Sequence, residues 1–262
     1  MKSTLRVALY YILAMTLVVA VWAGASWLLE TVRGREIVPA PWVTFAAARD
    51  EIGTLASAFG TSALRFLIAL AVAFLVGVPL GLAVGFEPKL DRYLSPLIYV
   101  VYPMPPVALL FFLYLAFGLG EVVRLVVVVL ALFFQVVVAA QGAAKYILPS
   151  HITAVRSAGA TRRQIYRHVV LPATLPSVLT AARVSVGLGI TMLYIAETML
   201  GVLLGPGEGG LGRFIAFYTF RPDISLAGVV GLALLGLLFY TALELLERTL
   251  CRWKFVGARG GT

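Results

Sequence analysis

Cysteine, histidine and charged side chains are all scarce in this 262-residue sequence, and each shortage removes a class of function. The single cysteine, Cys251, has no second cysteine for an internal disulfide, and we expect it to be an inert thiol. The two histidines, His151 and His168, have no cysteine or carboxylate at ligand spacing, which gives no basis for a metal site. Neither histidine lies in an apolar run, so an intramembrane Ser-His protease is excluded as well.

A nucleotide-binding motif is also missing. A P-loop reads GxxxxGK[ST], and none of the four lysines in the sequence follows a glycine. Gly205, Gly207 and Gly210 have GxGxxG spacing, but they follow an apolar run and not a strand, so we interpret them as an external turn. We therefore predict a non-catalytic protein with no catalytic residue, and any ATP that it uses must be hydrolysed by a second protein.

The low charge is matched by a high apolar content. Charged residues make up 13% of the chain and hydrophobic residues 61%, with a mean hydropathy of +0.98, whereas soluble domains have about 25% charged residues. A bilayer core about 30 Å thick needs roughly 20 apolar residues per helix. We predict an all-α, polytopic membrane protein with six transmembrane helices, at residues 7–29, 61–86, 93–117, 122–144, 177–203 and 224–249.

The basic residues set the orientation. The net charge of +9 comes without a solvated basic face that carries aromatics, so we attribute it to membrane topology and not to nucleic-acid binding. With the N-terminus inside, thirteen Lys and Arg residues fall on the cytoplasmic side and five outside, which predicts an N-in, C-in chain. Three more, Arg65, Arg124 and Arg183, are expected to snorkel from helix ends.

The chain divides into three parts on this prediction. Residues 1–60 hold the first transmembrane helix, expected to be a peripheral brace, and an external connecting segment with a surface helix. Residues 61–255 form a core of five transmembrane helices, and residues 256–262 form a short tail. The largest cytoplasmic feature is the loop at residues 145–176, which carries five basic residues and no acid.

Local signals inside residues 145–176 predict two short helices joined at a glycine. Ala154 favours the first helix, Gly159 suits the left-handed residue that closes it, and Thr161 with Gln164 has the spacing of a capping box. We expect the second helix to end before Pro172 and Pro176. Two interpretations stay open, since the loop is either a solvated basic connection or a docking element for a soluble partner. Its exposed small residues are Ala154, Ala158 and Gly159.

The run from Thr153 to Pro172 reads T-A-V-x3-G-x9-V-x-L-P. It resembles the EAA motif, E-A-A-x3-G-x9-I-x-L-P, in the cytoplasmic loop of permease subunits of ATP-binding-cassette (ABC) importers, with the spacing intact. Residues 158–189, Ala196-Glu197 and residues 209–212 are similar to the branch that imports nitrate, taurine, alkanesulfonates and related small molecules. The resemblance covers about residues 55–255.

This resemblance implies a type I ABC importer permease in the bacterial inner membrane, forming the path for a small, anionic solute. It implies cassette ATPase subunits that hold ATP and Mg, a second permease subunit, for which we favour a homodimer, and an external substrate-binding protein. No cofactor is expected in this chain, and the bilayer, not nucleic acid, is its other partner.

In the resembled family the ATPase grips the cytoplasmic loop, so the resemblance assigns coupling to residues 150–172. Thr153 stands where the motif has an acid, and we hypothesise that Arg156 and Arg162 compensate for the missing charge. The coupling residues implied are Thr153, Ala154, Val155, Arg156, Gly159, Thr161, Arg162, Val169, Leu171 and Pro172.

Three features lie inside the predicted membrane region. Gly77, Gly81 and Gly85 form a smooth ridge for helix packing, within or between subunits. Three prolines near residue 105 interrupt the third transmembrane helix, as a kink or as part of a path. The candidate path or gate residues on the third and fifth helices are Tyr102, Pro103, Met104, Tyr194 and Glu197.

Glu197 allows three interpretations, because an acid at membrane depth must face protein or water. It is a structural anchor, a gate or substrate contact, or a proton relay. The proton relay defines the alternative function, a proton-coupled secondary transporter that uses Glu197, and a scaffolding membrane subunit is a further alternative. The EAA-like spacing disfavours both alternatives.

Overall fold

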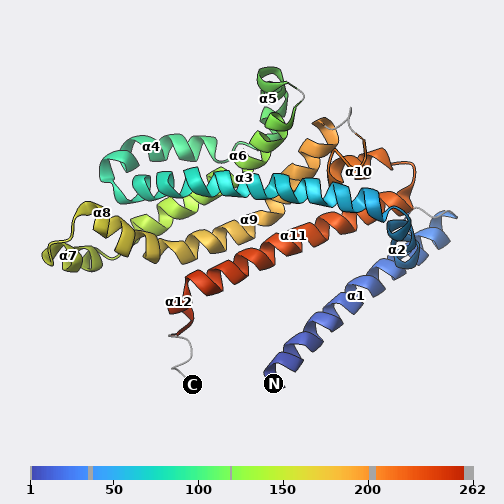
Figure 1. Cartoon of the computed structure of the whole chain (residues 1–262), viewed down its shortest axis with the longest axis horizontal. Helices are drawn as coiled ribbons and strands as arrows, with labels where there is room; N and C mark the ends of the chain where they lie inside the picture. Colours follow the sequence, from blue (N-terminus) through green and yellow to red (C-terminus); the bar gives the residue numbers. More distant parts are fainter. Residues whose placement is uncertain (1, 35–37, 119, 201–204, 257–262) are drawn as a thin grey trace.

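The computed structural model describes residues 2–34, 38–118, 120–200 and 205–256, and all regular structure in these ranges is helical. Figure 1 shows an elongated bundle of long helices, with α7 and α8 at one end and α2 and α10 at the other. The helices are α1 (Lys2–Arg33), α2 (Pro41–Asp50), α3 (Ile52–Phe86), α4 (Pro88–Val101), the 3-10 turn η1 (Pro106–Leu109), α5 (Leu110–Phe117), α6 (Glu121–Lys145), α7 (Pro149–Ser157), α8 (Arg162–Ile165), the π turn η2 (Tyr166–Val170), α9 (Leu171–Leu200), α10 (Leu211–Phe217), α11 (Pro222–Leu250) and α12 (Arg252–Val256).

Within the described residues, five helices are long and apolar enough to cross a membrane, or six if one bent pair counts as a span. The bent pair is the third predicted span, where α4 and the segment Pro106–Phe117 meet at 82°. Prolines at 103, 105 and 106 lack the backbone N–H that would continue the helix, so the predicted interruption is confirmed. Residues 93–117 are therefore not one straight helix, and the bent pair is either a broken span or a re-entrant segment.

The second span is longer than the sequence pattern suggested. We expected it to begin at residue 61, but α3 begins at Ile52 directly after the short surface helix α2. Pro41 opens α2 at a position where its missing N–H costs nothing. The external segment is therefore shorter than residues 30–60. The ends of two other expected features, residues 201–203 and the tail from residue 257, lie outside the described residues.

Helix α1 stands apart from the bundle in Figure 1 and is almost wholly exposed along its span. Two side chains tie it to the segment that leads into α2. The Trp22 indole donates to the Pro39 carbonyl at 2.9 Å, and the Ser26 hydroxyl donates to the Val38 carbonyl at 2.7 Å. The apolar side chains that the structure describes on the rest of α1 are largely exposed, as expected for a peripheral helix in lipid.

Helices α3 and α6 approach each other along the predicted glycine ridge. A Cβ atom at Gly77 would lie 3.1 Å from Val136 Cγ1, one at Gly81 would lie 2.5 Å from the Val137 carbonyl oxygen, and one at Gly85 would lie 2.2 Å from the Gln141 carbonyl oxygen. The two backbones thus touch, which only glycine permits at this distance. The ridge packs within the subunit, which settles one of the two possibilities left open by the sequence.

The contact predicts a matched pair of substitutions. Gly85→Ala forces a Cβ into the backbone of α6 and should destabilise the protein by about 1–3 kcal/mol, as overpacking does. Gly142→Ala meets no atom within 4 Å and should be neutral or stabilising, since alanine is the better helix former. Thermal unfolding in detergent measures both. Equal midpoints for the two variants would contradict the close approach of α3 and α6.

Cys251, just beyond α11, is fully buried against the common core of α3, α6, α9, α10 and α11. Burial raises the pKa of its thiol, which keeps the reactive thiolate rare at neutral pH. We expect the native protein to react with a maleimide at least about tenfold more slowly than the same chain unfolded in dodecyl sulfate. Labelling of the native protein at the rate of an exposed thiol would show that α11 does not end as described.

Candidate functional site

The cytoplasmic loop folds as the predicted helix, glycine and helix. Helix α7 ends in a glycine cap, in which Gly159 has a φ of +81°. The Gly159 N–H donates to the Arg156 carbonyl at 3.0 Å, and the Ala160 N–H donates to the Val155 carbonyl at 3.2 Å. These two bonds define a Schellman motif, and they satisfy carbonyls that the end of a helix leaves free.

The predicted capping box opens α8. The Gln164 N–H donates to the Thr161 hydroxyl at 3.4 Å, and the Thr161 N–H donates to the Gln164 side-chain oxygen at 2.8 Å. Thr161 has extended backbone angles, as an N-cap residue requires. The turn between α7 and α8 is therefore fixed at both ends by local hydrogen bonds.

One expectation about this loop is wrong, because the second helix does not stop before Pro172. Helix α8 passes through the π turn η2 and continues as α9. The Leu171 N–H donates to the Tyr166 carbonyl, five residues back, and Pro172 follows at a position that is not required to donate. The loop is thus joined to the fifth span without a break, and a displacement of α8 is passed directly to α9.

The residues implied in coupling occupy two kinds of position. Thr153, Ala154, Arg156, Gly159, Thr161, Arg162 and Leu171 are exposed, whereas Val155, Val169 and Pro172 are partly buried. The small residue Ala158 is exposed as well. The exposed group offers a surface on which the backbone of another protein can approach closely. Val155 helps to hold the loop against the bundle, since it packs against a buried cluster that includes Leu82 of α3 and Val136 of α6.

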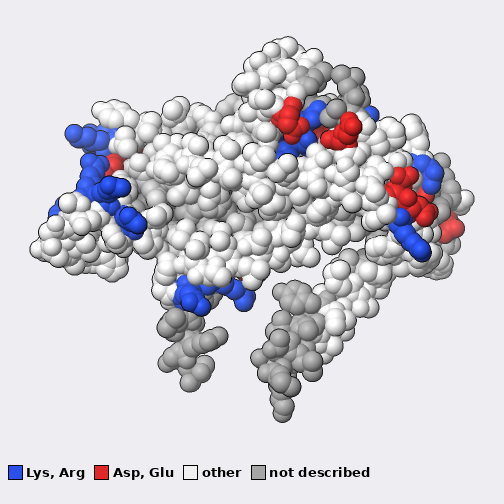
Figure 2. Space-filling model, in the orientation of Figure 1, with Lys and Arg blue, Asp and Glu red and all other residues white. Residues whose placement is uncertain are grey.

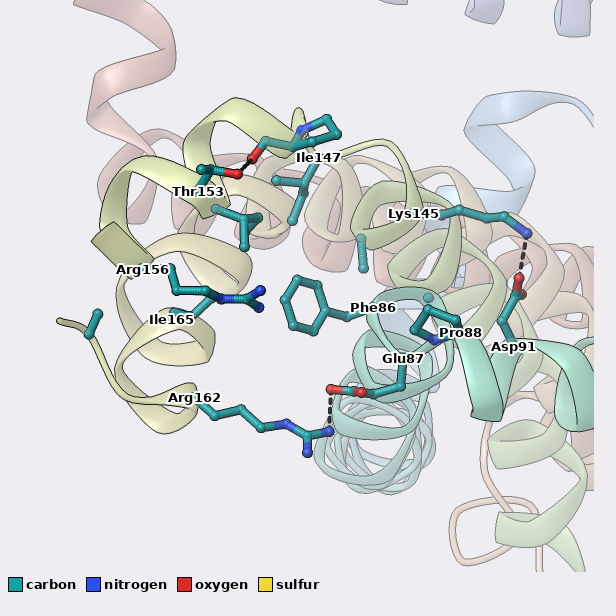
Figure 3. A pocket seen from close by; sticks show the side chains of 15 residues that line it. Phe86, Glu87, Pro88, Asp91, Lys145, Ile147, Thr153, Arg156, Arg162 and Ile165 are labelled. Carbon is teal, nitrogen blue, oxygen red and sulfur yellow. Dashed lines mark hydrogen bonds and ion pairs between the residues drawn. The ribbon is translucent and has the colours of Figure 1, made fainter. Parts of the chain in front are cut away.

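A groove of about 750 Å³ separates the loop from the corner between α3 and α4 (Figure 3). Two ion pairs cross it. Arg162 pairs with Glu87, and Lys145 Nζ lies 2.7 Å from a carboxylate oxygen of Asp91. The Tyr166 hydroxyl also donates to Glu87 at 3.0 Å. Sequence reasoning missed both acids. Each lies within three residues of Pro88, where α3 ends and α4 begins, opposite the basic loop.

Figure 2 shows Lys and Arg gathered over the end of the molecule that carries α7 and α8. Acidic side chains are visible mainly toward the other end, near α2 and the start of α6. This distribution fits a cytoplasmic α7–α8 end by the positive-inside rule. The side chains of Lys2, Arg6, Arg33, Arg35 and Arg259, which entered the sequence argument, lie outside the described residues.

At the opposite end, Glu197 lies in a buried network and has no exposed surface. The Ser62 hydroxyl lies 2.8 Å from both carboxylate oxygens, the Gly212 N–H donates to one of them at 2.8 Å, and Arg65 forms an ion pair with the other. Arg65 also forms a two-pronged pair with Glu121. The carboxylate therefore joins α3 and α9 to the first turn of α10.

Arg65 and Arg124 are buried, and the expectation that they snorkel to the interface is wrong. Arg124 pairs with Glu121 at 2.9 Å, so two arginines and two acids balance in charge. A buried charge persists only when it is paired and hydrogen-bonded, which explains why the four groups occur together. The signal available in the sequence was Glu121, three residues before Arg124 on one helix face.

The external glycines fold onto this network. Gly210 has a φ of +90°, and a Cβ there would lie 2.2 Å from a Glu197 carboxylate oxygen. The Leu211 N–H donates to the Ser62 hydroxyl at 2.8 Å. The turn is closed by donation of the Gly209 N–H to the Gly205 carbonyl at 3.2 Å. The GxGxxG spacing thus belongs to a turn, as the sequence indicated, and the structure adds that this turn covers Glu197.

The five candidate path residues do not form one cluster. Pro103 and Met104 are exposed at the break between α4 and α5, and the Tyr102 hydroxyl donates to Gln135 at 3.3 Å. Tyr194 is 36% exposed on α9, one turn before the fully buried Glu197. Within the described residues no group of three or more His, Cys, Asp or Glu could hold a metal. Membership of a path stays a prediction for all five.

Removal of the Glu197 carboxylate should destabilise the protein, because the buried guanidinium of Arg65 loses an ion-pair partner. Glu197→Ala leaves Arg65 with one buried partner fewer, and we expect a loss of about 3–5 kcal/mol, as for other broken buried pairs. Thermal unfolding and protease cleavage within residues 205–210 measure the effect. Glu208→Gln is the control, since Glu208 is exposed in the same turn. A Glu197→Ala protein with native stability and native protease resistance would contradict the anchor.

Comparisons with known proteins agree with this geometry. The family described as "Binding-protein-dependent transport system inner membrane component" matches residues 77–251. The taurine transport system permease protein TauC of Escherichia coli is 34% identical over 201 residues, which is 76% of this chain and 71% of that protein. The putative aliphatic sulfonates transport permease protein SsuC of Bacillus subtilis is 27% identical over 243 residues, 90% of this chain and 84% of that protein.

The fold matches a solved structure. The MetNI methionine ABC transporter in an inward-facing conformation has a TM-score of 0.63, with 22% identity over 77% of this chain and 98% of that chain. The predicted all-α, type I importer permease fold and the inner-membrane location are confirmed. The chain belongs to the family of binding-protein-dependent transport system inner membrane components, the permease subunits of ABC importers.

Proposed function

We propose that this permease forms the path for a small sulfonate such as taurine and couples it, through residues 150–172, to a separate cassette ATPase that holds ATP and Mg. The substrate class rests on the relatives, whose names give taurine and aliphatic sulfonates. The coupling rests on one observation, the capped α7–α8 element that continues into α9 without a break. Movement of a partner bound to this element is carried to a membrane span.

The path residues support a second permease subunit. Pro103, Met104 and Tyr194 are exposed on the single subunit, at the break in α4 and α5 and on α9. Polar and irregular backbone at membrane depth is tolerated where it faces protein or a water-filled cavity. A second copy of this chain that covers these residues would enclose such a cavity. We therefore propose a homodimer with the path between the two copies.

The external end supplies a surface for a binding protein. The turn at residues 205–210 leads into α10, whose first residues donate hydrogen bonds to Ser62 of α3 and Glu197 of α9. The turn is therefore attached firmly to both helices. A loaded binding protein that docks there would bias the same helices that the ATPase moves from the inside. The two partners would in this way act on one rigid unit.

The proton-coupled alternative has no support from the relatives or the fold. Glu197 is fully buried and its oxygens accept bonds from Ser62, Gly212 and Arg65. A relay needs a carboxylate that exchanges protons with water on each side in turn. We assign Glu197 to the anchor and not to a relay.

A bulky side chain on the loop tests the proposal. Ala154→Trp places a large ring on the exposed face of α7, and we expect the affinity for the co-expressed cassette ATPase to fall about tenfold or more, a loss of about 1.4 kcal/mol. Ala46→Trp on the external helix α2 is the control, because Ala46 is equally exposed but lies at the other end. Co-purification and ATP hydrolysis of the detergent-solubilised complex are measured.

Failure of every cassette ATPase from the same genome to co-purify with the native chain would refute the coupling proposal. Equal retention of the ATPase by Ala154→Trp and Ala46→Trp would place the contact elsewhere on the cytoplasmic face.

A further inference from the structure

The cytoplasmic loop has an unbalanced charge that the fold neutralises only in part. Residues 145–176 contain five basic residues and no acid. Two of the five are paired inside the subunit, Lys145 with Asp91 and Arg162 with Glu87. Arg162 is therefore already engaged by its own chain, whereas Arg156, the other basic residue of the compensation hypothesis, is not among the paired residues. Three arginines remain.

Two of the remaining arginines line a second, largely apolar groove. Arg163 and Arg167 line a groove with Val78, Leu82 and Leu171. That groove is formed by apolar side chains of α3 and by the start of α9, at the cytoplasmic end of both spans. Arginines in this position suit the headgroups of anionic lipids.

Arg156 is placed differently. It is exposed, it has no ion-pair partner among the described residues, and it lines the 750 Å³ groove on the loop side. Figure 3 shows its guanidinium pointing into the groove toward Phe86, while the two acids opposite are taken by Arg162 and Lys145. A partner that covers this groove would bury a cation with nothing in this chain to balance it.

Thr153, one turn before Arg156, cannot balance it. Its hydroxyl donates to the Pro149 carbonyl at 3.0 Å and carries no charge. The motif that this loop resembles has an acid at position 153, which calls for a basic group on the partner. Here the charge on that turn of α7 is positive.

We propose that the ATPase surface that receives this loop presents a carboxylate to Arg156, the reverse of the polarity that an acid at position 153 would require. The inference rests on the proposed function, since it names the chemistry of the same partner. A planar guanidinium pairs with a carboxylate through two parallel hydrogen bonds. Burial of Arg156 at the interface without such a pair would be costly, because an unpaired buried charge is strongly destabilising.

The sign of one substitution tests the polarity. Thr153→Glu adds an acid three residues before Arg156, which neutralises the arginine and repels a carboxylate on the ATPase. We expect the dissociation constant of the complex with the cassette ATPase that co-purifies with the native chain to rise about tenfold or more. Thr153→Gln has the size of the glutamate without its charge, so the ratio of the two dissociation constants isolates the effect of the charge. If Thr153→Glu binds more tightly than Thr153→Gln, the partner carries a basic group and the inference is wrong.

Charge reversal supplies the second arm. Arg156→Glu should weaken the complex about tenfold or more, and exchange of one acidic residue for lysine in the ATPase cleft should restore it. Arg167→Glu reverses the same charge in the groove beside α3, and in nanodiscs of neutral lipid it should weaken the complex less than Arg156→Glu does. Binding of Arg156→Glu at native strength, with loss only in anionic lipid, would show that Arg156 serves the membrane and would overturn the inference. A native chain that binds no cassette ATPase would refute the proposed function itself, which separates the two failures.

Discussion

Direct contact between the backbones of α3 and α6 sets the positions of both functional ends. Gly81 and Gly85 leave no room for a side chain against Val137 and Gln141, so the two helices lie at a fixed separation along much of their length. At the cytoplasmic end this contact places Glu87 within reach of Arg162 across the groove and Asp91 within reach of Lys145. At the outer end the same two helices bring Arg65 to Glu121. One packing constraint thus aligns two sites that are separated by the membrane.

The two ends differ in how they are held. The outer end is fixed by buried charges. Glu197 on α9 binds to side chains of α3 and to the first turn of α10. The cytoplasmic end is fixed by caps and by two ion pairs at the surface, and these are individually weak. Its mechanical link is covalent, through the π turn Tyr166–Val170 into α9. A rigid outer end and an exposed, directly connected inner end suit a subunit that is pushed from the inside.

Much of this arrangement could be predicted from the sequence, because its signals are local. Gly159, the pair Thr161 and Gln164, and the glycine ridge each act within one helix turn or one helix face, and each was confirmed. The passage through Pro172 could not be predicted, because a π turn depends on how the chain meets α3 and not on local preference. The pairing of Arg65 with Glu197 spans 132 residues, so only the folded bundle shows it.

The ion pairs of Glu87 and Asp91 could not be predicted from the sequence either. Both acids follow α3 within a few residues, and nothing in their own neighbourhood assigns them partners in a loop that is more than 50 residues away. The family resemblance gave the coupling segment by its spacing, but the charge balance of that segment needed the structure. The ion pair between Arg162 and Glu87 bears on the missing acid at position 153, because it leaves Arg156 as the arginine of α7 without an ion-pair partner among the described residues.

We expect this permease to import its substrate with energy from ATP and not from a proton gradient. The most direct measurement is uptake of radiolabelled taurine into vesicles that contain this chain, its cassette ATPase and its binding protein. Uptake should require ATP and the binding protein, and it should continue when an ionophore abolishes the proton gradient. Uptake that proceeds without ATP and stops when the proton gradient is abolished would contradict this expectation.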